Sequence, residues 1–126
     1  MPKISKMEAP ILVSDEHLEG RYAELGPFTV AFEHFHIDED PATLFRGLPE
    51  DRCQCEHWGM VRSGKVVFRF ADHDEEFTAG DFYYVPPGHL PLVAAGTEVA
   101  EFSPTAALAK TMEVLQANMA MEGEGQ

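Results

Sequence analysis

The side chains best suited to chemistry in this chain lie in residues 51–57, where metal-ligating types recur at every second position. The segment reads Asp-Arg-Cys-Gln-Cys-Glu-His and contains both cysteines of the protein. Side chains two positions apart point to the same face of a β-strand. If this segment is a strand, Cys53, Cys55 and His57 form one row, which Asp51 extends. Thiolate and imidazole ligands in such a row suit Zn²⁺ or another late divalent transition metal.

The two cysteines are poorly placed for a disulfide with each other. In an extended chain the Cα atoms of Cys53 and Cys55 lie about 6.6 Å apart with parallel side chains, near the upper edge of disulfide geometry. An alternative to metal binding is that this row fills the core, because cysteine is among the most buried residue types and one hydrogen bond satisfies an imidazole. A catalytic thiolate paired with His57 is disfavoured, because neighbours on one strand do not converge for proton transfer.

Composition limits the classes of protein and partner. The chain has 126 residues, enough for one domain with its own core, and no apolar run is long enough to cross a bilayer. The N-terminus lacks the apolar core of a signal peptide, and free thiols suit a reducing compartment, so we expect a cytoplasmic location. A formal net charge of −13 disfavours nucleic acid and anionic membranes as partners.

Most of the chain is predicted to form short β-strands. Residues typical of strands and turns predict strands over 28–37, 52–62, 66–70, 76–78, 82–85, 92–93 and 97–102. Turns every 8 to 12 residues are typical of a sandwich or barrel. Residues 28–103 are therefore expected to form an all-β sandwich or barrel, with residues 1–27 as an N-terminal arm that adds an edge strand and residues 38–50 as a loop.

The period of the apolar residues changes near the C-terminus. Ser103 is expected to be an N-cap and Pro104 the first residue of an amphipathic helix over 104–120. Residues 121–126 are expected to form a disordered tail. The apolar stripe of the helix consists of Leu108, Met112, Leu115 and Met119. This stripe must pack against either the barrel or a second subunit. We predict a homodimer, in which the stripe would offer extra apolar surface to bury.

Two stretches of the sequence resemble the motifs of the cupins. Residues 80–88, Gly-Asp-Phe-Tyr-Tyr-Val-Pro-Pro-Gly, resemble the second cupin motif, a Gly, five residues and Pro-x-Gly. The first motif reads His-x-His, three or four residues, Glu, six residues and Gly. When it is aligned on Gly64, His57 takes the Glu position, and the three-residue spacing puts Cys53 and Asp51 at the two His positions. The resemblance covers residues 28–103 and implies a double-stranded β-helix, the cupin jelly-roll barrel, followed by the C-terminal helix.

The resemblance extends to a group of small single-domain cupins and implies a metal in the barrel. Its sequence features here are Gly-Leu-Pro-x-Asp-Arg-Cys-Gln-Cys-x-His-Trp-Gly and Tyr-Val-Pro-Pro-Gly-His. At the position of the usual histidine of the second motif, this chain has Pro91. His89 has the same strand parity and can reach the barrel mouth. The implied ligands are Cys53, His57 and His89, with Cys55 or Asp51 as an extra ligand. Zn²⁺ is the expected metal, with Fe, Ni, Cu and Mn as alternatives.

Two functional hypotheses follow from this resemblance. In the first, the barrel binds a metal ion and a small organic molecule, with isomerisation, hydrolysis and oxygenation all open because the fold does not determine the reaction. In the second, the barrel is a metal-free binding module or a structural dimer. Tyr83 shares parity with His89 and is the expected substrate-pocket aromatic, whereas Trp58 is expected on the outer face. The remaining histidines, His17, His34, His36 and His73, are expected at the surface or in the core rather than at the site.

Overall fold

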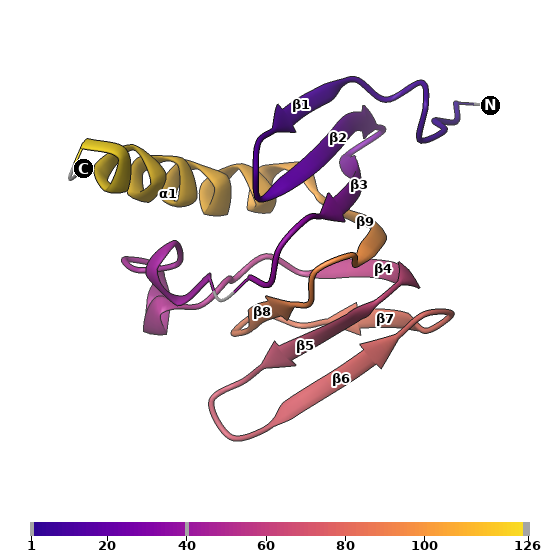
Figure 1. Cartoon of the computed structure of the whole chain (residues 1–126). Coiled ribbons are helices and arrows are strands. Elements are labelled where there is room, and N and C mark those ends of the chain that lie inside the picture. The colour runs from indigo at the N-terminus through magenta and orange to yellow at the C-terminus, as the bar shows by residue number, and fades with distance from the viewer. Residues whose placement is uncertain (1, 40, 125–126) are drawn as a thin grey trace.

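The computed structural model describes residues 2–39 and 41–124, with side chains described up to residue 121. Its strands form two antiparallel sheets (Figure 1). The six-stranded sheet contains, in spatial order, β1 (Ile11–Ser14), β2 (Leu18–Leu25), β3 (Phe28–Phe35), β9 (Glu98–Pro104), β4 (His57–Ser63) and β7 (Phe82–Val85). The three-stranded sheet contains β6 (Asp74–Thr78), β5 (Lys65–Arg69) and β8 (Leu90–Val93). The expected all-β jelly-roll with a C-terminal helix is confirmed.

The core lies between the two sheets and follows from the alternation within each strand. In β4, His57, Gly59 and Val61 are buried, whereas the residues between them are only partly buried. The buried cluster joins residues of five strands, namely Val61, Val66, Phe68, Tyr83, Val85, Val93 and Val99. Because side chains of one parity face the opposite sheet, a metal-ligating side chain at an inward position points into the barrel interior.

The hairpin between β4 and β5 turns at Gly64, the glycine on which the first motif was aligned. Its φ is +82°, a backbone conformation that favours glycine. A Cβ at this position would overlap the side chain of Thr97, which is fully buried. The Thr97 hydroxyl accepts a hydrogen bond from the Lys65 amide at 3.0 Å and donates to the Lys65 carbonyl at 3.1 Å. The turn is therefore fixed by close packing as well as by backbone conformation.

The segment before β4 departs from the expected strand over 52–62. The strand begins only at His57, and Cys53 forms an isolated β-bridge with His89. Shortly before Cys53, the backbone takes left-handed φ values at Glu50 (57°) and Asp51 (56°). This turn ends the 3-10 segment η2 (Pro49–Asp51) and prevents a continuous ladder through both cysteines.

The two ends of the chain also differ in detail from the sequence analysis. Within the expected N-terminal arm, β2 pairs with β3 along its whole length, and β1 forms the edge. The helix α1 spans Thr105–Glu124, so the expected tail overlaps its last turn, and residues 125–126 lie outside the described residues. The expectation that Ser103 caps the helix is wrong, because Ser103 belongs to β9. Its hydroxyl contacts a histidine of the barrel instead.

The helix α1 covers one end of the barrel rather than presenting its whole apolar stripe to solvent. Figure 1 shows it beside the segment that carries η1 (Pro41–Thr43) and η2, with hairpin β5–β6 farthest from it. Leu108 and Leu115 pack against the buried cluster around Phe45. The amide of Asn118 donates to the Leu44 carbonyl at 2.6 Å and thereby ties the helix to this segment. No helix in the described part of the chain has the length and apolarity to cross a membrane.

Candidate metal centre and cavity

A cavity of about 330 Å³ lies inside the barrel and reaches α1. This volume is within the range of small-molecule sites. The walls combine aromatic and aliphatic side chains with a few polar groups from β2, β3, β4, β7 and β9. Leu108, Met112, Leu115 and Met119, the stripe of the helix, line the same cavity. The helix therefore closes the end of the barrel and forms part of its binding surface.

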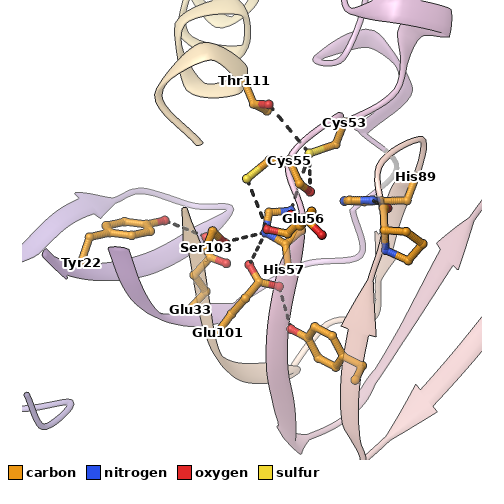
Figure 2. A network of polar contacts seen from close by, with 12 residues as sticks. Tyr22, Glu33, Cys53, Cys55, Glu56, His57, His89, Glu101, Ser103 and Thr111 are labelled. Carbon is orange, nitrogen blue, oxygen red and sulfur yellow. Dashed lines mark hydrogen bonds and ion pairs between the residues drawn. The ribbon is translucent and has the colours of Figure 1, made fainter. Parts of the chain in front are cut away.

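Three buried potential metal ligands meet at this cavity. One ligand atom from each of Cys53, His57 and His89 lies within 4.8 Å of the others. The Cys53 Sγ lies 3.6 Å from the His57 Nε2, and the two imidazole centroids are 5.0 Å apart. Figure 2 shows the three side chains converging from the segment before β4, from β4 itself and from the turn before β8. A thiolate with two imidazoles is a donor set that suits late transition metals.

Main-chain pairing positions His89 against Cys53. The Cys53 amide donates to the His89 carbonyl and the Gly88 amide donates to the Cys53 carbonyl, both at 2.8 Å. Gly88, whose φ is 96°, ends the Pro-Pro-Gly turn of the second motif. The His89 Nδ1 lies 2.8 Å from the Pro86 carbonyl, which only accepts hydrogen bonds, so this nitrogen carries the ring proton. The unprotonated Nε2 then faces the cluster.

The His89 Nε2 is the strongest sign of a missing ligand. The side chain is fully buried, and Nε2 has no hydrogen-bond partner among the described residues. Buried polar atoms normally have a partner, so such an atom requires an explanation. A metal ion bound to Nε2 would satisfy it, and a hydrogen bond from Nδ1 to a carbonyl is the usual support for a histidine ligand.

Strand β9 orients His57. The His57 Nδ1 lies 2.6 Å from the Ser103 hydroxyl and 3.5 Å from the Glu101 Oε2. A carboxylate and a hydroxyl on Nδ1 leave Nε2 directed toward the Cys53 sulfur, as in the carboxylate–histidine pairs of metal sites. Figure 2 shows Glu101 and Ser103 on the same side of the ring. Ser103 therefore has a role in the site that its expected capping role did not indicate.

Burial sets the protonation states of the cluster. It lowers the pKa of His57 to about 4, and burial together with the nearby His57 lowers the pKa of His89 to about 4. Burial also raises the pKa of Cys53 to about 11. Both imidazoles are thus neutral at pH 7, as metal ligation requires, whereas the thiol must lose its proton on binding a metal. The same values disfavour a thiolate–imidazolium nucleophile, although the sulfur and ring nitrogen are in contact.

The structure does not bring the other two expected ligands into this cluster. Cys55 is fully buried near Phe45, and its sulfur donates to the Glu56 carbonyl at 3.4 Å. Asp51 is exposed, and its Oδ1 accepts a hydrogen bond from the Gly47 amide at 3.0 Å. Shared parity would have aligned these side chains with Cys53 only in a continuous strand, which the turn before Cys53 prevents.

The structure adds a pair of inward carboxyl groups that the sequence analysis missed. The Tyr22 hydroxyl donates to the Glu33 Oε2, and the Tyr83 hydroxyl donates to the Glu101 Oε1, both at 2.7 Å. The two glutamates lie on adjacent strands, since β3 pairs with β9. Burial raises the pKa of both carboxyls above the usual range, and the Glu101 charge raises that of Glu33 further. Tyr83 thus lines the cavity beside Glu101.

A signal for these glutamates was present in the strand alternation. Glu101 has the same parity in β9 as the buried residues Val99 and Ser103. A charged residue in the inward row of a strand is unfavourable unless it serves a function. The remaining histidines lie outside the cluster. His17, His34, His36 and His73 are exposed, and His17 pairs with Glu39 at the cavity rim at 2.8 Å.

Comparison with solved structures identifies the fold. A structural-genomics protein of unknown function from Rhizobium leguminosarum matches with a TM-score of 0.58 and 13% identity, over 82% of this chain and 94% of that one. An RmlC-like cupin from Shewanella frigidimarina matches with a TM-score of 0.54 and 15% identity, over 80% and 88%. The Fe(II) form of HppE matches with a TM-score of 0.56 and 12% identity, over 82% of this chain and 60% of HppE.

These similarities show a shared fold. The chain has the cupin jelly-roll fold, as its two sequence motifs implied. No protein-family model and no curated protein matches the sequence. One neighbour is an iron(II) protein. In this chain, Cys53, His57 and His89 form a group whose ligand atoms lie close enough together to hold a metal ion. The identity of the metal and the ligand must be argued from the site itself.

Proposed function

We propose that this protein is a small cupin that binds a divalent transition metal through Cys53, His57 and His89 and a small organic molecule in the adjoining cavity. The observation that carries the proposal is the buried His89 Nε2, which has no partner in the described structure and faces two other ligand atoms. Three protein ligands leave a four-coordinate metal one position for water or an organic ligand. The cavity on which the cluster lies has room for such a ligand.

The donor set favours zinc. One thiolate and two imidazoles form a mixed soft and borderline set that zinc accepts without a redox change. Copper also uses two histidines and one cysteine, so it is the leading alternative on ligand type, whereas Fe, Ni and Mn are further alternatives. When bound, the metal would polarise an oxygen atom of the organic molecule or lower the pKa of a water. The residues around the cluster then determine which protons move.

Glu101 is the group best placed to hold or release a proton. Its Oε1 accepts the Tyr83 hydroxyl and its Oε2 lies 3.5 Å from the His57 Nδ1. Burial raises the pKa of this carboxyl above its usual range, toward the pH at which general acids and bases are most effective. The apolar wall around it excludes water from this exchange. Isomerisation and hydrolysis both fit such a proton-transfer group.

A metal-free binding module is the second candidate, and one distance favours it. The Cys53 Sγ lies 3.6 Å from the His57 Nε2, which is suitable for a hydrogen bond between a thiol and an imidazole. These two side chains are therefore satisfied without an ion. Only the His89 Nε2 then lacks a partner, and a polar atom of an organic ligand would supply it.

Elemental analysis of protein purified without an affinity tag separates the two candidates. We expect a stoichiometric metal, with zinc as the leading element, in the native protein and in a His73→Ala control, because His73 is exposed and is not one of the three clustered ligand residues. The His89→Ala variant should lose the metal. A metal-free native protein that takes up no metal ion under reducing conditions would support the binding module instead.

We also propose a homodimer and a cytoplasmic location. Both cysteines are free and buried, which supports a reducing compartment. The helix stripe gives less support to a dimer than expected, because it lines the cavity. The outer face of the six-stranded sheet gives more, because Trp58 stacks on Phe102 with centroids 5.6 Å apart, and Tyr84 and Phe82 on edge strand β7 are exposed.

A further inference from the structure

The permanently charged side-chain types that line the cavity are of one sign. Four carboxyl groups contribute to its walls and rim, from Asp15, Glu33, Glu39 and Glu101. Neither lysine nor arginine is among the lining side chains of the described structure. His17 pairs with Glu39 at the rim, and that carboxylate raises the pKa of the imidazole. The interior pair, Glu33 and Glu101, has no comparable cationic partner, because the adjacent His57 is neutral near pH 7.

A bound metal would compensate these two carboxyls unequally. Glu101 contacts the ligand His57 and would share in the positive charge of the ion. Glu33 has no such contact, and the structure gives it one hydrogen bond, from Tyr22 to Oε2. Because a buried carboxylate is costly unless it is paired, Glu33 is the group that most needs a positive charge from a ligand.

Aromatic rings surround the same space. Tyr22, Phe35, Phe68 and Tyr83 line the cavity, and the Phe68 and Tyr83 rings lie 5.2 Å apart. Aromatic faces attract ammonium groups, most strongly when the groups are shielded from water. Figure 2 shows Tyr22 and Glu33 on one side of Glu101 and His89 on the other side of His57. The unpartnered His89 Nε2 in the same cavity indicates that a ligand, either the metal or the organic molecule, completes this interior.

We propose that the organic ligand of this cavity is a small cation, an amine or a methylated ammonium, whose positive charge is held by Glu33 and the aromatic rings around it. The proposal rests on the proposed function in taking this cavity as the ligand site, and it specifies the class of molecule. Anionic ligands are disfavoured, because no lysine or arginine of the described structure faces them there. The formal charge of −13 also attracts cations toward the protein.

Ligands matched in shape and different in charge test this proposal. Choline, 3,3-dimethylbutan-1-ol and 3,3-dimethylbutanoate form one set, and 3-methylbutan-1-amine with 3-methylbutan-1-ol forms another. Binding is followed by two-dimensional NMR titration of the native protein as purified. At least one cation should bind about tenfold more tightly than its neutral match, and the anion should bind least. If neither cation is preferred, or if the anion binds best, the proposal is overturned.

Substitutions then locate the charge. Glu33→Gln keeps the size of the side chain and should abolish the preference for the cation. Glu24→Gln is the matched control, because Glu24 is an exposed residue of β2, and this variant should retain the preference. A preference that survives in folded Glu33→Gln would contradict the assignment of the charge to Glu33. Tyr22→Phe, which leaves the carboxylate without its hydrogen bond, serves as a second variant if Glu33→Gln does not fold. It should alter the ratio of cation to neutral affinity.

Metal content measured on the same samples separates this proposal from the proposed function. If the protein is metal-free but prefers the cation, the proposed ligand class is supported and the proposed metal site is contradicted. If it holds a stoichiometric metal but binds the cation and its neutral match equally, the metal site is supported and the ligand class is contradicted. Glu33→Gln should retain its metal, because Glu33 contacts none of the three ligands.

Discussion

Near the site, the inner and outer faces of the six-stranded sheet reverse the usual distribution of polar and apolar residues. On the inner face, His57 of β4 lies beside Glu101 and Ser103 of β9. On the outer face, the next residues along the same two strands, Trp58 and Phe102, stack on each other. Stability alone favours apolar residues inside and polar residues outside. This inversion supports the two roles that we propose, ligand binding for the polar interior and dimerisation for the aromatic exterior.

The largest expected effect tests whether the inner face is a metal site. Cys53→Ser should weaken metal binding by more than about 100-fold, because the thiolate is the softest ligand of the set. This loss exceeds the largest loss of affinity usual for residues that only support a metal ligand, which is about 100-fold. Cys55→Ser is the matched control, since that thiol is also buried but lies outside the cluster. Competition with a chromophoric chelator measures both affinities. Equal affinity in the two variants would remove Cys53 from the site.

Acid should reveal the buried neutral histidines of the metal-free protein. The folded-state pKa of His89 is about 4, below its ordinary value of 6.5, so its contribution to stability is present above pH 6.5 and is lost as the pH falls toward 4. Glu33 and Glu101 have raised folded-state pKa values, so their contributions run in the opposite direction and partly mask this loss. A comparison with a His89→Gln variant cancels the glutamate contributions.

The measurement is the free energy of unfolding in urea at pH 6.5 and pH 5, with chelator present. Relative to the native sequence, His89→Gln should gain roughly 2 kcal/mol between these two conditions, from 1.5 pH units at about 1.4 kcal/mol each. His34→Gln replaces an exposed histidine and is the control. A stability difference that does not change with pH would show that burial does not hold His89 neutral.

The outer face makes its own prediction. If its aromatic surface forms the homodimer interface, Trp58→Ala should weaken dimerisation by about 2 kcal/mol, the usual threshold for a central interface residue. Leu12→Ala is a matched control, because Leu12 is 66% exposed on edge strand β1, at the opposite edge of the sheet from β7. Sedimentation equilibrium across a dilution series gives the dissociation constants. A native protein that is monomeric at tens of micromolar would contradict the proposal that this aromatic surface forms a homodimer interface.

The sequence predicted the fold well because its motifs and turns are local signals. Gly64 and the Pro-Pro-Gly turn ending at Gly88 both adopt positive φ values where the motifs require a turn. Parity also indicated correctly that Trp58 would lie on the outer face, where it packs against Phe28 and Phe102. These features depend on residues near one another in the sequence, so a single chain reveals them.

The site was predicted less completely because its geometry depends on distant segments. Parity along residues 51–57 assumed a strand, but left-handed residues at positions 50 and 51 divert the chain, and Cys53 pairs with His89 instead. Glu33 and Glu101 become neighbours only through the pairing of β3 with β9. Their inward parity was readable from each strand, yet their proximity required the sheet order, which local sequence does not specify.

The smallest expected effect distinguishes a supporting carboxylate from one that merely fills the interior. Glu101→Gln preserves the size of the side chain and the acceptor for the Tyr83 hydroxyl but removes the charge beside the His57 Nδ1. Metal affinity should fall by about tenfold, the lower end for a partner of a ligating histidine. Glu98→Gln on the same strand removes a charge that pairs with Lys6 at 2.8 Å instead, so it should leave the affinity unchanged. If both variants bind metal like the native protein, then Ser103 alone orients the ring, and the inward glutamates serve the organic ligand rather than the metal.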